Sequence, residues 1–296
     1  MKQRLFVTLS LAGLAMATFG ATKPKTAIKS LNKTTIQQPT YTEWHDLQVN
    51  AINRFPLHTN FFTYPADDWV SEKDGKIVSK DILHMNKTES KYFLSLDGTW
   101  KFNWVANADQ RPTDFYKEDL DDSKWKTMNV PGNWEMNGFG DPEYVNIGFA
   151  WRGHFDQQPP AVPTKDNHVG SYRRIIDIPA NWDGKQVVAH FGSVTSNIYL
   201  YVNGKFAGYA EDSKVAAEFD ITPYLKKGKN LIAFQTFRWC DGSWDEDQDF
   251  WRLSGVARES YLFARDAKLH LEDIRVTPDL VNNYKDGVLN ISAKVK

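Results

Sequence analysis

Residues 197–209 read Asn-Ile-Tyr-Leu-Tyr-Val-Asn-Gly-Lys-Phe-Ala-Gly-Tyr, and this stretch decides the fold class. Two runs rich in β-branched and aromatic residues flank the dipeptide Asn203-Gly204. Asn-Gly is the strongest short signal for a two-residue hairpin turn, because both residues accept the positive φ that such a turn requires. The stretch therefore predicts two antiparallel strands joined by a tight turn.

Strand patterns of the same kind continue in both directions along the chain. Trp100, Phe102 and Trp104 alternate with polar residues after Asp97-Gly98, a dipeptide that also predicts a tight turn. Many short strands with Gly, Asn, Asp and Pro turns, and no long helical period, indicate an all-β antiparallel sandwich or jelly roll. Further strands are expected at 92–94, 171–178, 186–191 and 231–237, with one turn of helix at 222–225.

The sandwich is expected over residues 44–266, after two N-terminal segments. Lys2 and Arg4 precede a short apolar run that ends at Gly20, so residues 1–20 predict a signal peptide and export to the periplasm or the outside. The run is too short and too diluted by Thr and Gly to predict a retained membrane anchor. Residues 21–43 are rich in Lys, Thr and Gln and predict a flexible linker.

A second unit is expected to begin at residue 267. Residues 269–277 and 288–295 alternate as two strands across a turn. Because two strands cannot bury a core, residues 267–296 are expected to be the start of a truncated domain.

Composition excludes several classes of protein. The 36 basic and 37 acidic side chains give a net charge of −1, which argues against a nucleic-acid partner. The only cysteine, Cys240, excludes an intramolecular disulfide, and its aromatic neighbours favour a buried, inert thiol over a catalytic one. Aromatic residues make up 14% of the chain, which fits either a large core or faces that stack on sugar rings.

The densest polar cluster lies at residues 241–252. It holds five carboxylates between Asp241 and Asp249, which could bind a hard cation, act as the acid pair of a glycosidase, or form a solvated acidic loop. Three tryptophans flank the cluster, and a loop that served only solubility would not need them. The flanking residues are Trp239, Trp244 and Trp251.

Residues 131–146 form a second candidate region. This stretch is rich in turns, aromatic rings and amides, and a sugar pocket uses amides and carboxylates beside aromatic faces. A long ordered loop held by its aromatic residues explains the same composition. No Gly-rich phosphate loop, Cys/His metal spacing or nucleophile elbow occurs in the sequence.

With these two regions the sequence resembles the β-galactosidases of glycoside hydrolase family 2, the large multidomain type. The blocks run in family order, and the last is the longest and most specific. They are Trp44 with 53–58, 95–102, 130–135, 159–163, 170–174, Gly208-Tyr209 with Asp212-Ser213, and 241–258.

The resemblance implies a jelly-roll, galactose-binding-like domain followed by an immunoglobulin-like domain. It also implies that a (β/α)₈ barrel holds both catalytic glutamates and a magnesium ion. This sequence contains no such barrel, so we expect no catalytic residue in it and no activity from this part alone. The complete enzyme is expected to be a homo-oligomer that takes β-galactosides.

The resemblance assigns two substrate-binding residues to this chain. Asn146 matches the Asn of a Tyr-x-Asn block, and Asp241 matches the Asp of a Trp-x-Asp-Gly block. Both are expected to reach the galactose pocket, and Asp241 is also expected to bind sodium as an exposed carboxylate. Departures from the family at 147–151 and 167–170 leave the shape of the aglycone side open.

Two alternatives remain at this level. One is a stand-alone carbohydrate-binding or assembly module without catalysis. The other is a related family 2 activity, such as a glucuronidase or a mannosidase.

Overall fold

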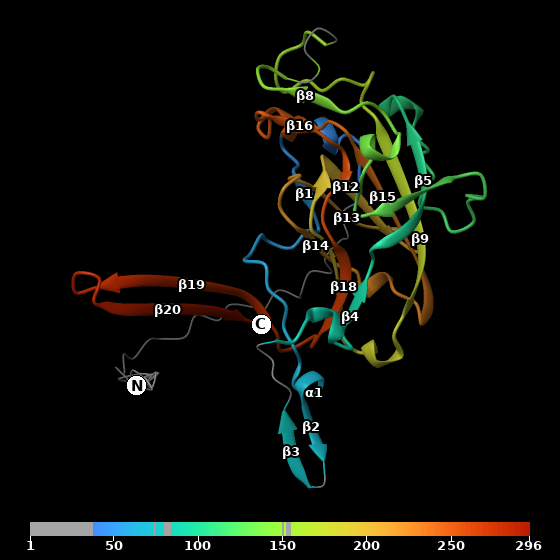
Figure 1. Cartoon of the computed structure of the whole chain (residues 1–296). Coiled ribbons are helices and arrows are strands. Elements are labelled where there is room, and N and C mark those ends of the chain that lie inside the picture. Colours follow the sequence, from blue (N-terminus) through green and yellow to red (C-terminus); the bar gives the residue numbers. More distant parts are fainter. Residues whose placement is uncertain (1–37, 74, 80–83, 150, 152–154) are drawn as a thin grey trace, which may run out of the picture. The chain divides into compact units, whose positions relative to one another are not determined.

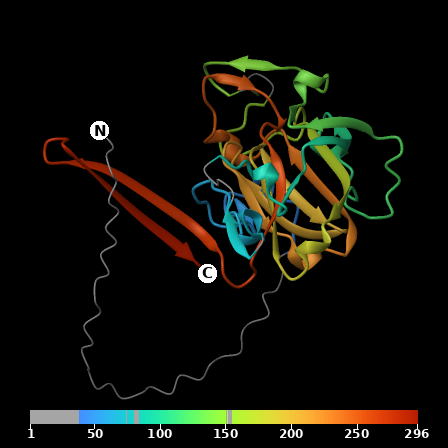
Figure 2. The same ribbon diagram turned by 60° about the horizontal axis from the view of Figure 1, so that its bottom comes forward.

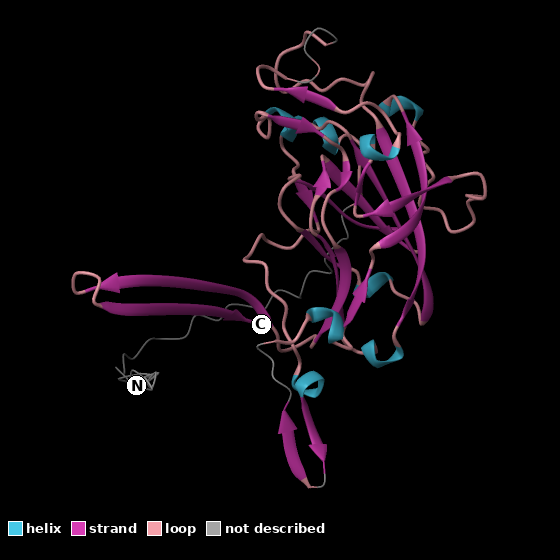
Figure 3. Ribbon diagram, viewed as in Figure 1, coloured by secondary structure: helices cyan, strands magenta, loops and turns pink. Residues whose placement is uncertain are grey.

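The fold is known from a computed structural model that describes residues 38–73, 75–79, 84–149, 151 and 155–296. The predicted signal peptide at 1–20, and the predicted linker as far as residue 37, lie outside these residues. In the part described, strands dominate and helices are limited to single turns (Figure 3). No helix among the described residues is long and apolar enough to cross a bilayer.

Two stacked sheets form the body of the molecule, which confirms the predicted all-β sandwich (Figures 1 and 2). The jelly-roll classification stays a prediction. The larger sheet has the order β1 (Ala51–Ile52), β13 (Lys205–Glu211), β12 (Asn197–Val202), β15 (Gly228–Phe237), β9 (Val169–Ile178), β5 (Gly98–Val105) and β6 (Lys126–Val130). The smaller sheet has the order β14 (Ala217–Asp220), β10 (Gln186–Phe191), β18 (Ser260–Arg265) and β4 (Phe93–Ser95).

Apart from one long hairpin, the remaining elements of the described residues are short. Four further ribbons are β11 (Val194–Thr195) with β17 (Gly255–Val256) and β7 (Gly132–Asn133), β16 (Phe250–Arg252) with β8 (Glu143–Val145), β19 (Leu271–Val281) with β20 (Asp286–Val295), and β2 (Val70–Lys73) with β3 (Lys76–Ser79). The helical turns are α1 (Ala66–Trp69), η1 (Glu43–His45), η2 (Lys87–Glu89), η3 (Ala108–Gln110), η4 (Glu135–Asn137), η5 (Ala180–Trp182), η6 (Thr222–Tyr224) and η7 (Asp241–Trp244).

The hairpin predicted at 197–209 is confirmed. Strands β12 and β13 pair antiparallel, and Val202 lies opposite Lys205. The turn residues Asn203 and Gly204 have φ values of 49° and 76°, the positive φ pair that an Asn-Gly hairpin turn requires. The turn of helix predicted at 222–225 is present as η6.

The tight turn predicted at Asp97-Gly98 does not close a hairpin. β4, before the dipeptide, pairs with β18 of the smaller sheet, whereas β5, after it, pairs with β6 and β9 of the larger sheet. The chain therefore passes from one sheet to the other at this point. Gly98, with φ 117°, provides the backbone conformation for that change of direction.

Strand β12 is buried on both of its faces. Ile198, Leu200 and Val202 point into the core between the two sheets. Tyr199 and Tyr201 point to the opposite face, where they belong to a second apolar cluster. Because successive side chains of a strand point to opposite faces, such a strand needs apolar residues at every position.

The second cluster covers the outer face of the larger sheet. Trp44 stacks on Phe237 with ring centroids 5.0 Å apart, and Phe115 meets Tyr201 edge-on at 5.3 Å. Tyr41, which lies within the predicted linker 21–43, stacks on Tyr199 at 5.7 Å. The N-terminal segment and the loop around Phe115 therefore complete the fold as a third layer.

Replacing Gly208 with Ala is expected to destabilise the sandwich by about 2 kcal/mol, because it overpacks the core. A Cβ at Gly208 of β13 would lie 2.4 Å from the Phe219 ring of β14 and 2.7 Å from the Ile52 carbonyl oxygen. Urea unfolding measures the loss. Gly287→Ala is the matched control, since a Cβ there meets no atom within 4 Å. Equal stability of the two variants would contradict the close approach of β13 and β14.

Candidate functional site

Asn146 lies just after β8, at an exposed bend. β8 pairs with β16, and Tyr144 lies directly opposite Trp251. Their rings are 5.6 Å apart, and both side chains are more than half exposed. Asn146 therefore directly follows the ribbon of β8 and β16, at the top of Figure 1, which carries two exposed aromatic residues.

Asp241 is the first residue of η7, and it is buried, with 4% of its surface exposed. The expectation of an exposed carboxylate was wrong. The turn of η7 folds the side chain inward, where its Oδ1 accepts a hydrogen bond from the Gly242 amide at 3.0 Å. Asp241 therefore lies in a protein-lined site.

No hydrogen bond, ion pair or ring contact joins Asn146 to Asp241 in the part of the chain that the structure describes. An ion pair does join the segments that lead to them. Arg238 precedes Asp241 by three residues, Glu143 precedes Asn146 by three, and Arg238 Nη2 lies 2.9 Å from Glu143 Oε2. This ion pair connects the end of β15 to β8, so each of the two predicted sugar-binding residues lies three positions after one of its two partners.

A cavity of about 240 Å³ lies around this anchor. His168 stacks edge-on against Trp104, and burial lowers the pKa of its imidazole to about 4, so His168 is neutral at physiological pH. The cavity combines aromatic rings with a larger number of charged or titratable groups, which include Asp141, Lys165 and Asp166. Its lining includes Glu143, Trp151, His168, Arg238 and Trp239.

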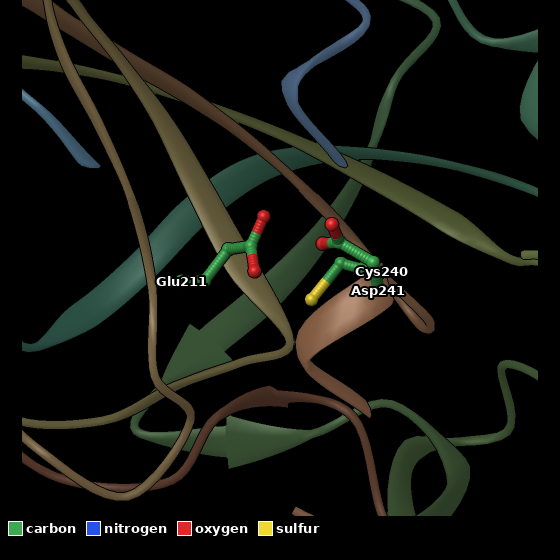
Figure 4. Close-up of side chains that lie close together, drawn as sticks. All are labelled: Glu211, Cys240 and Asp241. Carbon is green, nitrogen blue, oxygen red and sulfur yellow. The ribbon is translucent and has the colours of Figure 1, made fainter. Parts of the chain in front are cut away.

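Glu211 is the site residue that the sequence analysis missed. It ends β13, and its carboxylate, the Cys240 thiol and the Asp241 carboxylate offer ligand atoms within 4.8 Å of one another (Figure 4). Tyr209 donates a hydrogen bond to Glu211 Oε1 at 2.5 Å. Glu211 immediately precedes Asp212-Ser213, so its place in a family block was the available signal.

A hydrogen bond joins the Glu211 and Asp241 carboxyl groups. Burial, together with the neighbouring Asp241 and against the hydrogen bond from Tyr209, raises the pKa of Glu211 to about 8. Burial also raises the pKa of Asp241, whereas its hydrogen bond with Glu211 lowers it. With this pKa, Glu211 is protonated at pH 7 and donates a hydrogen bond to Asp241.

The donor set suits a hard cation. Two carboxyl groups supply oxygen ligands, which hard cations prefer, and a cation between them can replace the proton of their hydrogen bond. Cys240 does not add a thiolate, because burial raises its pKa well above the ordinary value. Its 2% exposure confirms the predicted burial of this thiol.

Among the described residues, three of the other four acids of the cluster have structural partners, and the fourth, Asp245, is exposed. Glu246 Oε1 accepts a hydrogen bond from the Ser213 amide at 2.7 Å. Asp247 forms an ion pair with Arg252, and Asp249 accepts a hydrogen bond from the Tyr144 hydroxyl. These contacts fasten the loop after η7, so the cluster is not a free acidic surface.

Comparison with known proteins identifies the family. Residues 93–266 match the model described as "Glycosyl hydrolases family 2, sugar binding domain". The chain belongs to glycosyl hydrolase family 2.

The curated relatives agree with this assignment. The chain is similar to a β-galactosidase of Priestia megaterium, with 38% identity over 256 residues that cover 86% of this chain and 24% of that protein. It is also similar to a β-galactosidase of Streptococcus thermophilus, with 41% identity over 73% of this chain and 21% of that protein. The chain thus spans about a quarter of the length of these relatives.

A solved structure supports the fold alone. The beta-glucuronidase of Bacteroides uniformis aligns with a TM-score of 0.52 and 22% identity, over 69% of this chain and 22% of that chain.

Glu211→Gln is expected to stabilise the chain at pH 7 by roughly 1 to 3 kcal/mol. The folded pKa of about 8 exceeds the ordinary value of 4.5, so the folded state holds a proton that the unfolded state releases. Stability is then lost as the pH rises from about 4.5 to about 8, and the neutral amide removes this dependence. Urea unfolding in sodium-free buffer at pH 4, 6 and 8 measures the difference.

Glu72→Gln is the control, because Glu72 is exposed and forms no ion pair with the described residues, so its replacement should leave the pH profile as in the parent chain. If the free energy of unfolding changed equally with pH in the parent chain and in Glu211→Gln between pH 6 and 8, this result would contradict a protonated Glu211.

Proposed function

We propose that this chain is the sugar-binding N-terminal region of an exported β-galactosidase that hydrolyses terminal non-reducing β-D-galactose residues. The main support for the proposal is that one ion pair holds together the segments that lead to the two sugar-binding candidates, Asp241 and Asn146. This ion pair joins Arg238 to Glu143. Relatives that are 33% to 41% identical and named β-galactosidases support the substrate class. Export is inferred from residues 1–20 alone.

Asp241 and Asn146 would recognise the sugar through complementary groups. The Asn146 amide can donate and accept hydrogen bonds at once, which suits a pair of neighbouring hydroxyls. Asp241, supported by Glu211, would hold sodium, and a bound sodium ion supplies a positive charge that orients hydroxyl oxygens. Burial of Asp241 keeps water away from that carboxylate and strengthens its interactions.

Bond cleavage is assigned to carboxylates outside residues 1–296, where magnesium is also expected. Retaining glycosidases need two carboxyl groups roughly 5–5.5 Å apart on either side of the bond. Glu211 and Asp241 are close enough, but both are buried, Glu211 is held by Tyr209, and a hydrogen bond joins them. This pair is therefore proposed to bind and not to cleave.

The hairpin of β19 and β20 is proposed to begin an immunoglobulin-like unit. Its register sets Val276 opposite Ile291 and Pro278 opposite Leu289, so one face of the ribbon is continuously apolar. The opposite face carries pairs such as Thr277 with Asn290. Such an amphipathic pair needs another layer over its apolar face.

Asp241→Asn in the complete enzyme is expected to raise the sodium concentration for half-maximal activity and the KM for a nitrophenyl β-galactoside. Each should rise by about tenfold, because the substitution removes one charged contact. Steady-state kinetics over a sodium series measures both. Asp245→Asn is the matched control, since Asp245 is exposed in the same loop. Kinetics that do not change with sodium in Asp241→Asn would remove Asp241 from the site.

The purified polypeptide of residues 21–296 is expected to bind but not to hydrolyse, because its close carboxyl pair is buried. Release of nitrophenol from β-galactoside, β-glucuronide and β-mannoside substrates measures this, with the complete enzyme as the positive control. Turnover by the polypeptide above a blank would contradict the assignment of the catalytic groups. Preference of the complete enzyme for the glucuronide would contradict the substrate class.

A further inference from the structure

A separate polar network fastens the segment after β1 to the smaller sheet. Residues 53–58 leave β1 and cross to β14. There the Phe55 amide donates a hydrogen bond to the Glu218 carbonyl oxygen at 2.9 Å, and Arg54 forms an isolated antiparallel β-bridge with Phe219. His58 follows and points to the Glu218 side chain. Glu218, 6% exposed, is thus contacted by this segment through both its backbone and its carboxylate.

The Glu218 carboxylate lies between two imidazoles. His190 Nδ1 is 2.7 Å from Glu218 Oε1, and His58 Nε2 is 2.9 Å from Glu218 Oε2. His190 is 1% exposed and stacks on Tyr261 at 4.3 Å, so its ring is fixed by the sheet. The carboxylate therefore joins a fixed histidine of β10 to a histidine of the crossing segment.

The contacts of His58 require it to be charged. Its Nδ1 lies 2.7 Å from the Thr59 carbonyl oxygen, and its Nε2 faces the Glu218 carboxylate. Both partners are acceptors only, and a neutral imidazole has a single N–H to donate. The pKa of Glu218 is lowered to about 2, so its carboxyl group is ionised at neutral pH, and both hydrogen bonds can then form together only when His58 is an imidazolium.

We propose that His58, Glu218 and His190 form a proton-dependent latch that fastens residues 53–59 to the smaller sheet. The latch is closed while His58 carries both protons. When it loses one, either the Thr59 or the Glu218 bond is lost, and a lone pair of the ring then faces an acceptor oxygen.

The directions of the pKa shifts define a pH window. The hydrogen bond to Glu218 raises the pKa of His58 above 6.5 despite burial, so its stabilisation is complete below 6.5 and is lost as the pH rises through the raised value. Burial opposes ionisation of Glu218, but its bonds to His190 and His58 lower its pKa from 4.5 to about 2. The stabilisation from ionised Glu218 is complete above pH 4.5 and is lost as the pH falls toward about 2. The latch is therefore fully closed between about 4.5 and 6.5.

Other charges act on the same network. Asp273 adds to the stabilisation of cationic His58, and Arg265 interacts with Glu218. Lys87 lies over the Tyr261 ring on which His190 stacks. A cavity of about 250 Å³ lies beside the network, and His58 and His190 are part of its lining. The other charged residues that line this cavity are Lys214, Arg258 and Glu259.

Opening the latch would change this cavity. Phe55, Leu57 and His58 of the crossing segment line it together with His190 and Glu218 of the sheet. Release of His58 therefore allows the wall formed by the crossing segment to move, while the wall formed by the sheet stays in place. An exported protein would meet this change on passing from an acidic to an alkaline medium.

The test uses the described chain itself and needs no enzymatic activity. NMR titration of the His58 ring should give a pKa above 6.5. Hydrogen exchange of the Phe55 amide, corrected for the intrinsic pH effect, should lose about tenfold in protection for each pH unit between 6.5 and that pKa and should level off above it. His45→Gln is the control, because His45 is an exposed histidine outside the network.

Glu218→Gln separates the charge from the packing. Its amide can accept from His190 and donate to a neutral His58, so the latch should stay closed at alkaline pH and Phe55 protection should become independent of pH. A His58 pKa at or below 6.5 in the parent chain, or the same pH-dependent loss of protection in Glu218→Gln, would overturn the proposal.

Discussion

The burial of β12 on both of its faces is the constraint on which the rest of the structure depends. Leu200 contributes to the core between the sheets, while Tyr199 and Tyr201 form the centre of the outer cluster with Phe237. The outer cluster exists only because Trp44 and Phe115 cover that face. The fold is thus a sandwich with an added third layer, and the 14% aromatic content is used largely for these two interiors.

The candidate site follows from the ends of these strands. β13 ends at Glu211 and β15 ends shortly before Asp241, so the two strands on either side of β12 deliver the carboxyl pair. The ion pair of Arg238 with Glu143 then places the exposed ribbon that carries Asn146. A rigid sheet positions the buried part of the site, and a paired ribbon positions the exposed part.

Local patterns predicted the strands well and the long-range partners poorly. Asn203-Gly204 was interpreted correctly because a two-residue hairpin is complete within its own residues. Asp97-Gly98 has the same local chemistry, but its flanking strands pair with β18 and β9, far away in the sequence, and the dipeptide contains no information on those partners.

The same limit explains the site residues. Family resemblance pointed to Asp241, but its burial depends on η7 folding against Glu211 of another strand. Glu218 has partners 160 and 28 residues away, which no local pattern reveals. Charged residues in a strand pattern read as solvent-facing, and only the assembled sheet shows them enclosed.

The central claim is that Asp241 and Asn146 bind one galactose unit together. A crystal structure of the complete protein with galactose and sodium tests it most directly. We expect the Asn146 amide and the Asp241 carboxylate, or a sodium ion on that carboxylate, within hydrogen-bonding or coordination distance of the same sugar ring. Galactose bound in the catalytic site without contact to either residue would contradict this joint role.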